Sequence, residues 1–185
     1  MKTIFKILKL LSSSMFILFL SIGIVSCQDK KENKKSERNE HTSIDISPCQ
    51  FLTNTEIKNA LDIPADAQTS KVEKNTTYPS CFYKWESITF PYEVYKGRMA
   101  DYPAELSIVL AANTNKKLYE RSISVYKDGE VIDGVGEMAT WSKKMSQITF
   151  LYKTNLIHVH TKTSADAAAN KSKSIKIAKL IIERL

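Results

Sequence analysis

Residues 148–161 read ITFLYKTNLIHVHT, and this stretch carries the clearest structural signal in the chain. Apolar side chains at every second position are typical of a half-buried β-strand, because successive side chains point to opposite faces. Two such runs flank a tight polar connection, Lys153-Thr154-Asn155. They are Ile148, Phe150 and Tyr152 before it, and Ile157, Val159 and Thr161 after it. The stretch therefore predicts an antiparallel hairpin with one face turned toward a core.

Three other segments are predicted to be strands. Residues 81–85 and 106–110 show the same alternation, through Cys81, Tyr83 and Trp85 and through Leu106, Ile108 and Leu110. Residues 138–141 follow the turn Asp133-Gly134-Val135-Gly136, whose glycines predict positive φ angles and close packing. Because this turn lacks a third glycine and a following helix, it does not fit a dinucleotide-binding fingerprint.

Helical signals lie between and after these strands. A capping-box pattern at residues 53–56 predicts a short helix that ends near Leu61. A second helix is predicted from residue 113 to a stop at Gly129. Its apolar side chains, spaced i, i+4 and i+7, are Tyr119, Ile123 and Tyr126.

The last helix is predicted to have Ser164 as its N-cap and Asp166 in its first turn. Its inward-facing stripe would consist of Ser174, Ile177, Ala178, Ile181 and Leu185. The resulting order of helix, strands, helix, strands and helix predicts an α+β domain. Its expected architecture is an antiparallel sheet with helices packed on one face.

The first 26 residues have the composition of a lipoprotein signal peptide. Residues 1–9 carry three lysines and no acid, and residues 10–26 carry no charge, an order typical of secretory signals. The sequence Ile24-Val25-Ser26-Cys27 resembles a lipobox, after which acylated Cys27 would anchor the chain in a bilayer. The alternative is an uncleaved transmembrane helix. Both interpretations place the rest of the chain outside the cytoplasm.

Residues 27–43 are expected to be the lipidated cysteine and a disordered tether. Of the sixteen residues after Cys27, nine are charged and none is aliphatic or aromatic. Burial of apolar surface therefore cannot offset the conformational entropy that the segment would lose on folding. A charged run at this place resembles the surface-export signal of some Gram-negative lipoproteins. The predicted location is therefore the cell envelope, outside the cytoplasm, with the outer membrane favoured. Surface exposure is one alternative, and the membrane leaflet stays open.

Residues 44–185 have the length of a single domain. The formal net charge of +7 falls to +4 when the three lysines of the signal are removed. So modest an excess on an exported domain makes nucleic acid an implausible partner.

Cys49 and Cys81 are the cysteines that remain once Cys27 is lipidated. In an oxidising compartment, two cysteines in a small domain are expected to form a structural disulfide. A metal pair would need further ligands, and a catalytic cysteine would need a free thiolate. The sequence therefore predicts one disulfide that staples the domain.

Three short motifs resemble a known group of proteins. They are residues 48–56 (PCQFLTNTE), residues 81–85 (CFYKW) and residues 134–141 (GVGEMATW). They resemble, in order, the PC-x-L-L-T-x-x-E, C-x-Y-x-W and GxGxxAxW motifs of small exported lipoproteins of unknown function, best known from actinobacteria. Phe51 departs from the leucine usual in that family. The resemblance implies a compact α+β domain like other extracytoplasmic sensor or binding domains, and it implies no reaction.

His158 and His160 are the candidate metal-binding or catalytic residues. Side chains two positions apart on a strand share a face, so two imidazoles could hold zinc or copper with a third ligand from a neighbouring strand. The competing interpretation is that Ile157 and Val159 occupy the core face and leave both histidines facing solvent. The sequence contains no nucleophile elbow and no convincing carboxylate pair, so neither catalysis nor a cofactor is expected.

Residues 91–103, PYEVYKGRMADYP, are predicted to form a long connection because they show no clear periodicity. They contain Tyr92, Tyr95, Arg98 and Tyr102, and tyrosine and arginine often anchor protein interfaces. Two interpretations stay open. The segment is either a recognition surface or a loop or short helix folded over the sheet with its tyrosines packed.

The predicted function is a non-catalytic binding or protein-interaction domain held at a membrane through acylated Cys27. Its other partner is predicted to be a protein or a small molecule, which the sequence does not identify. The alternative is a metal carrier or an enzyme that uses His158 and His160.

Overall fold

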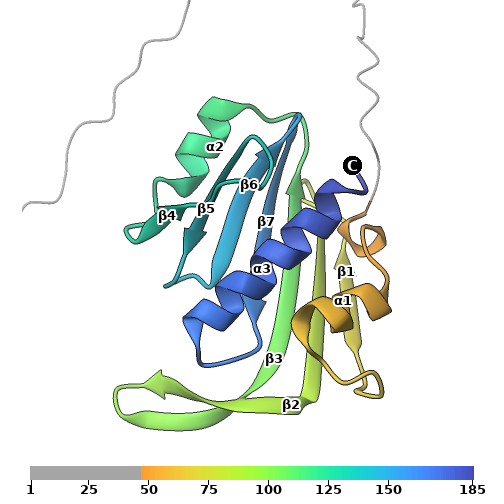
Figure 1. Ribbon diagram of the computed structural model, residues 1–185, viewed down its shortest axis with the longest axis vertical. Helices are drawn as coiled ribbons and strands as arrows, with labels where there is room; N and C mark the ends of the chain where they lie inside the picture. The colour runs from red at the N-terminus through yellow and green to blue at the C-terminus, as the bar shows by residue number, and fades with distance from the viewer. Residues whose placement is uncertain (1–46) are drawn as a thin grey trace, which may run out of the picture. The chain divides into compact units, whose positions relative to one another are not determined.

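The computed structural model describes residues 47–185, which belong to one compact unit, His41–Leu185. The predicted signal peptide, the lipidation site Cys27 and the tether at residues 27–43 lie outside the described residues. The elements, shown in Figure 1, are η1 (Pro48–Gln50), α1 (Asn54–Leu61), β1 (Ser70–Lys74), β2 (Ser80–Tyr95), β3 (Arg98–Ala111), α2 (Lys116–Ile123), β4 (Gly129–Val131), β5 (Met138–Ser142), β6 (Gln147–Tyr152), β7 (Asn155–Lys162) and α3 (Ala167–Ile182).

The strands form one seven-stranded antiparallel sheet in the order β1-β2-β3-β7-β6-β5-β4. The hairpin predicted at residues 148–161 is confirmed as β6 and β7, with Ile148 paired to Val159 and Tyr152 to Asn155. The strands predicted from the other three segments are confirmed within β2, β3 and β5. The edge strands β1 and β4 have no such sequence signal, because all their residues are exposed.

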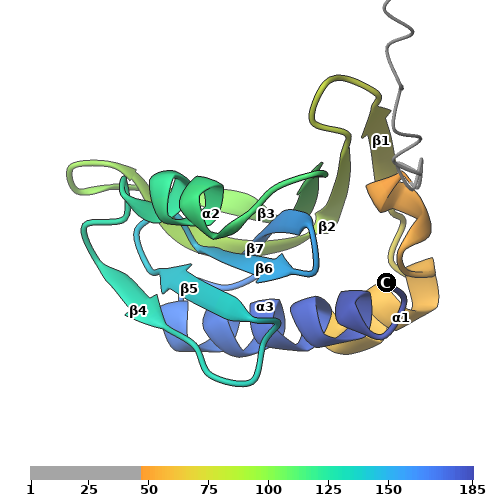
Figure 2. The same ribbon diagram turned by 90° about the horizontal axis from the view of Figure 1, so that it is seen from above.

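Helices lie on both faces of the sheet (Figure 2). α1 and α3 cover the face that holds the main core, in which Ile57, Ile177 and Ile181 are fully buried. α2 packs on the opposite face, which we name the open face, where Tyr119 is buried with Leu151 in a smaller cluster. The antiparallel α+β architecture is therefore confirmed, whereas the prediction that helices share one face holds for α1 and α3 but not for α2.

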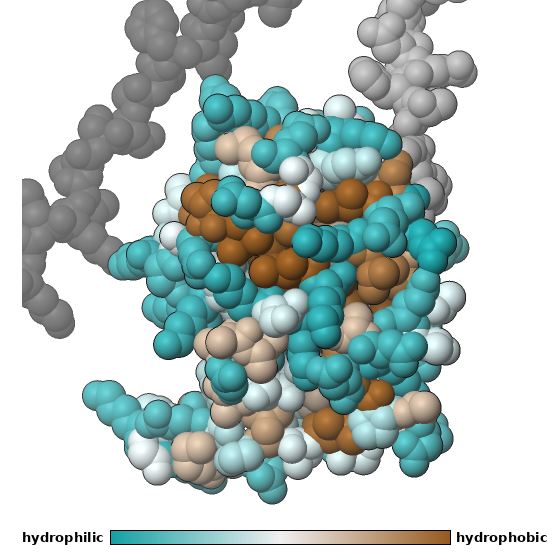
Figure 3. Space-filling model, in the orientation of Figure 1, coloured by the Kyte–Doolittle hydropathy of each residue, from teal (hydrophilic) through white to brown (hydrophobic). Residues whose placement is uncertain are grey.

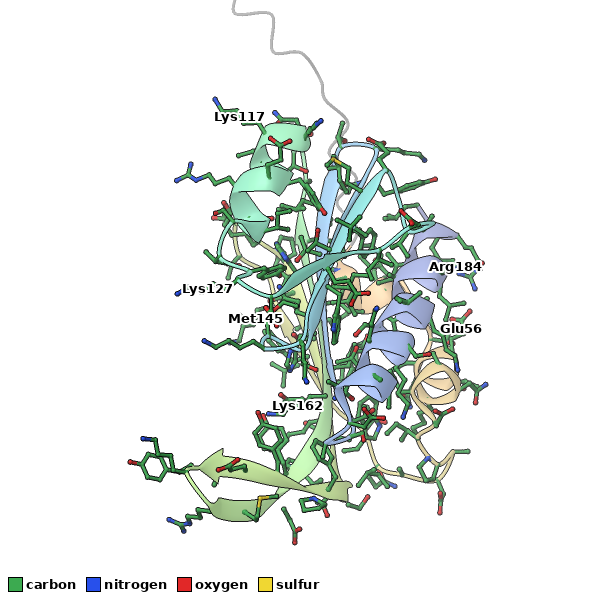
Figure 4. All side chains as sticks on the ribbon, turned by 60° about the vertical axis from the view of Figure 1, so that its left-hand side comes forward. Glu56, Lys117, Lys127, Met145, Lys162 and Arg184 are labelled. Atoms are coloured by element: carbon green, nitrogen blue, oxygen red, sulfur yellow. A yellow bond between two sulfur atoms is a disulfide. The ribbon has the colours of Figure 1, made fainter. Side chains whose placement is uncertain are left out.

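The N-terminal segment of the domain is fixed to the sheet by a disulfide. Cys49 and Cys81 form the predicted bond, with a Cα–Cα distance of 5.0 Å and a sequence separation of 32. A disulfide that closes a loop of this length stabilises a fold by about 3–4 kcal/mol on the chain-entropy model. The predicted capping box opens α1, and its Glu56 also forms an ion pair with Arg184 near the C-terminus (Figure 4).

The second helix is shorter than predicted. α2 ends at Ile123, and Gly129, the predicted terminator, begins β4 instead. The backbone N–H of Tyr126 donates to the Ile123 carbonyl in a tight turn, and the Tyr126 hydroxyl lies 2.6 Å from Thr149 Oγ1 on β6. Tyr126 is therefore held by the sheet rather than by the helix.

The last helix begins two residues later than predicted. Asp166 is its N-cap, and its side chain accepts a hydrogen bond from the backbone of Ala168. Ser164 Oγ accepts one from the Asp166 backbone instead. Leu185 lies beyond the helix and is half-buried. The other members of the predicted stripe are buried, namely Ser174, Ile177, Ala178 and Ile181.

The turn before β5 depends on two glycines with positive φ angles, Gly134 (φ 72°) and Gly136 (φ 60°), as the sequence predicts. A Cβ at Gly134 would meet no atom within 4 Å, whereas a Cβ at Gly136 would collide with the backbone carbonyl of Leu151. The first position therefore needs glycine for its conformation alone, and the second also for close packing against β6.

We expect Gly134→Ala to lower the free energy of unfolding by about 1–2 kcal/mol, the cost of a left-handed backbone conformation for alanine. Gly136→Ala should cost about 1–3 kcal/mol more, because the added methyl overpacks the contact with β6. Urea denaturation of the two matched variants measures the difference. Equal losses would show that the approach of Gly136 to Leu151 contributes nothing to stability.

Candidate functional site

Residues 89–103, which we name the arm, form the outer part of the β2–β3 hairpin, so the prediction of a long connection at residues 91–103 is wrong. Phe90 pairs with Tyr102, and Tyr92 with Ala100, across the two strands. The arm residues are exposed or half-buried on both faces. On β2 the half-buried Phe90 and Tyr92 do alternate with exposed residues, but Pro91 interrupts this run, and a proline within a run argues against a central strand.

The arm leaves the sheet and is paired on neither side. The register of β2 and β3 shifts just before Thr89, and irregularities of this kind bend a strand pair. β1 pairs with β2 only as far as Lys84, and β7 with β3 only as far as Glu105. Each arm strand contains one proline, Pro91 or Pro103. Figure 3 shows the arm projecting at lower left, with an open hollow between it and the body.

A lysine of the neighbouring strand fixes the base of the arm. The Lys162 Nζ atom lies 3.4 Å from the ring centroid of Tyr92 and 4.0 Å from that of Tyr102. The two ring centroids are 5.6 Å apart, and Figure 4 shows Lys162 beside the base of the arm. An ammonium over an aromatic face gains about 0.5–2 kcal/mol. This contact, which we name the lysine clamp, packs two of the predicted tyrosines against the body.

Tyr102 also connects the arm to the histidine pair. Its hydroxyl donates to Glu105 Oε1 at 2.8 Å, and His160 Nε2 lies 3.1 Å from the same oxygen. Burial and the hydrogen bond to Glu105 raise the pKa of Tyr102 to about 12. Burial also raises the pKa of Glu105, but the hydrogen bonds from His160 and Tyr102 outweigh it and hold that pKa below its usual value. An ionised carboxylate therefore joins two sites that the sequence predicts separately.

The tip of the arm carries the other two predicted interface residues. Tyr95 and Arg98 pair across the hairpin, and the Tyr95 side chain is 72% exposed. Val94 is 49% exposed and Met99 57% exposed. The predicted interface residues thus divide into a packed pair of tyrosines at the base and an exposed pair at the tip.

A cavity of about 430 Å³ lies between the arm and the body, and we name it the arm cavity. Its lining includes Tyr92 and three lysines, Lys143, Lys144 and Lys162. Asp128 also lines it, and hydrogen bonds from the Lys144 backbone N–H and from a serine hydroxyl lower the pKa of this carboxyl. The lining is positively charged beside an aromatic wall, which suits an acidic ligand.

The two candidate histidines face away from the core, since Ile157 and Val159 are fully buried. They are engaged separately, His158 with a threonine of β6 and His160 with Glu105. Within residues 47–185, no three His, Cys, Asp or Glu side chains lie close enough together to hold a metal ion. A metal site at this pair stays a prediction.

A chain of hydrogen bonds at Nδ1 favours one tautomer of His158. Its Nδ1 lies 2.7 Å from Thr149 Oγ1 and 3.3 Å from Gln147 Nε2. Gln147 Nε2 also donates to the Tyr126 hydroxyl, which contacts Thr149 Oγ1. An amide nitrogen is only a donor, so Nδ1 accepts and the imidazole proton sits on Nε2. Burial lowers the pKa of His158, which keeps the ring neutral.

Comparisons with family models, with curated proteins and with solved structures find no match for this chain. The resemblance of its three motifs to exported lipoproteins therefore stays an expectation. In the part of the chain that the structure describes, no helix combines the length and the apolar character needed to span a bilayer.

Sequence reasoning identifies the tyrosines and the histidines but misses the residues that connect them. Glu105 pairs with Lys162 in the register of β3 and β7, which brings a carboxylate and an ammonium to the base of the arm. Only the pairing of β3 with β7 reveals Glu105 and Lys162 as part of the site. No spacing within one sequence segment places them beside Tyr102 and His160.

We expect the domain to lose stability as the pH falls from about 7.5 to about 5.5, because the unfolded chain binds a proton at His158 more readily than the folded chain does. The pKa of His158 is lowered in the folded state. Its contribution is therefore present above the unfolded pKa of about 6.5 and is lost as the pH falls below it. The variant His158→Gln should show a flatter dependence of unfolding free energy on pH in urea denaturation.

Parallel pH profiles for the wild type and His158→Gln would contradict this expectation. They would show that the burial of a neutral imidazole at position 158 does not contribute to the pH dependence.

Proposed function

We propose that this protein is a lipid-anchored, extracytoplasmic, non-catalytic binding domain that holds an acidic segment of a protein partner against the arm. The observation that carries the proposal is the arm itself. It is a hairpin that leaves the sheet, is fixed at its base by the lysine clamp, and exposes Tyr95 and Met99 at its tip.

The arm contributes little to the core of the domain. Its side chains are exposed or half-buried, while fixing the backbone of a residue costs about 1–2 kcal/mol in conformational entropy. Tyrosine, methionine and arginine are enriched at protein interfaces. Tyr95 pairs with Arg98 at the tip, and Met99 follows Arg98 on the same strand. An arm already held by the lysine clamp has less freedom to lose when a partner binds.

The arm cavity supports an acidic partner. Lys143, Lys144 and Lys162 line it together with the Tyr92 ring. Carboxylates of a partner would be attracted by the lysines, and complementary charge of this kind speeds association and favours the right partner. An apolar side chain of the same segment would pack on Tyr92.

The location of the protein is part of the same proposal. The signal-like residues 1–26 and the lipobox-like sequence ending at Cys27 support a lipid anchor outside the cytoplasm. The charged run after Cys27 is what favours the outer membrane and its surface. The Cys49–Cys81 bond is of the kind that persists in oxidising compartments outside the cytoplasm. The resemblance of the three short motifs to small exported lipoproteins is consistent with the same location.

The alternative function, a metal carrier or an enzyme at His158 and His160, has less support. Both rings are engaged in hydrogen bonds within the domain, His158 through Nδ1 and His160 through both nitrogens. A metal ion or substrate would have to displace Glu105 or the Met145 carbonyl from His160 before that ring could bind metal or act in catalysis.

The arm tip is tested by photo-cross-linking of the full chain in cells of the source bacterium. A benzoylphenylalanine residue in place of Tyr95 should form an adduct with a protein partner, and the cross-linked segment should be acidic. The same residue in place of Lys179, which is exposed on α3, is the matched control and should form none. Equal adducts at both positions, or none at either, would contradict the proposal.

The variant Tyr95→Ala should weaken this association while leaving the melting temperature nearly unchanged. The side chain is 72% exposed, and exposed substitutions usually change stability by less than about 0.5 kcal/mol. Differential scanning calorimetry of the purified variant measures this. A large fall in melting temperature would show that Tyr95 stabilises the fold and would count against a recognition surface.

The anchor is tested by labelling cells with a fatty acid analogue. The variant Cys27→Ser should lose the label, because the thiol that carries the lipid is gone. The cleaved form of the protein should also be absent from the membrane fraction. The variant Ser36→Ala, within the predicted tether, should behave as the wild type. Retention of the label in Cys27→Ser would refute lipidation at this residue.

A further inference from the structure

A second cavity lies on the open face between α2 and the strands β3 and β7, and we name it the α2 cavity. Its volume is about 560 Å³, within the range of about 300–1,000 Å³ typical of small-molecule sites. Much of its lining is apolar, from Val109, Ala111, Leu118, Val125 and Leu156. It shares no lining residue with the arm cavity.

Exposed apolar side chains gather at this cavity. Tyr78 is 59% exposed, Leu118 40% and Val125 69%, and all three belong to its lining. Within residues 47–185 they make up three of the nine exposed large hydrophobic residues. Apolar surface concentrated around one concavity marks a binding site more often than scattered single residues do.

Two polar groups in the lining would orient the polar end of a ligand. His158 lines it, and the hydrogen bonds to its Nδ1 leave the proton on Nε2, which has no hydrogen-bond partner within residues 47–185. Arg121 of α2 also lines it and forms no ion pair in the described part of the chain. The lining contains no aspartate or glutamate.

An apolar lining with a guanidinium and an imidazole N–H group suits a ligand that has both an alkyl chain and a carboxylate. A guanidinium binds a carboxylate through two parallel hydrogen bonds, and a neutral imidazole N–H adds a third donor. The apolar lining stabilises an alkyl chain by removing it from water, at about 0.8 kcal/mol for each buried CH₂. Neither feature alone would distinguish a fatty acid from a simple anion or from a neutral lipid.

We propose that the α2 cavity binds a single-chain amphiphile with a terminal carboxylate, a free fatty acid. The carboxylate is held by Arg121 and by the Nε2–H group of His158, and the alkyl chain packs along Val109, Leu118 and Leu156. This site is independent of the partner proposed for the arm, because the two cavities share no residue.

The test is isothermal titration calorimetry of residues 41–185, purified with the disulfide formed, with sodium decanoate below its micelle concentration. This piece contains the sheet, the core and the disulfide of the compact unit. We expect one saturable site. Arg121→Gln should weaken binding by about tenfold or more, since a hydrogen bond to a charged group is lost. Decanol, which lacks the carboxylate, should bind the wild type about tenfold or more weakly than decanoate does.

Two further variants complete the design. Leu118→Asp places a like charge in the lining and should abolish decanoate binding, while Lys179→Gln removes a cation from α3 on the other face and should change nothing. Arg121 and Leu118 are both exposed, so circular dichroism should find their variants folded. In the wild type, the nitrogen NMR signal of His158 Nε2 should shift on titration.

Three results would overturn the proposal. They are the absence of saturable decanoate binding, equal affinity for decanol, and wild-type affinity in Arg121→Gln or Leu118→Asp. None of these results bears on the arm, whose partner is tested by cross-linking at Tyr95.

Discussion

The burial of alternate side chains from the central strands beneath α3 and α1 is the constraint on which the rest of the domain depends. Trp85, Leu106, Ile148 and Ile157, each from a different strand, are at most 1% exposed on this face. Full burial of a large apolar side chain contributes about 1.5–3 kcal/mol, so a slip of one residue in any strand would be costly. The same period turns the alternate side chains of these strands toward the open face, where Val109, Leu156 and His158 line the α2 cavity.

Strands with a face in the main core are predicted from the sequence, and strands whose residues are all exposed are not. The hairpin at residues 148–161 and the inner parts of β2 and β3 are predicted correctly because one face of each is in the core. β1 and β4 are missed because all their residues are exposed. The arm is missed because Pro91 and Pro103 interrupt its strands and none of its side chains is fully buried. The disulfide was predictable from the number of cysteines and from the predicted oxidising compartment, without geometry.

The candidate site was predictable only in part for a related reason. Tyrosine and histidine are conspicuous residue types, and the sequence identifies Tyr92, Tyr102 and His160 as candidates. What makes them one site is the pairing of β3 with β7, which places Glu105 opposite Lys162. That relation spans more than fifty residues of sequence, and no local spacing encodes it. The α2 cavity is likewise assembled from a helix, a turn and two strands.

The two prolines of the arm have a consequence for self-association. An unpaired hairpin with free edges is a template for strand addition, the route by which sheets join edge to edge into polymers. Pro91 and Pro103 each lack an N–H group, and each sits on a different arm strand, so neither edge offers an uninterrupted row of donors. The arm can therefore stay extended in solution and display its side chains without recruiting further copies of itself.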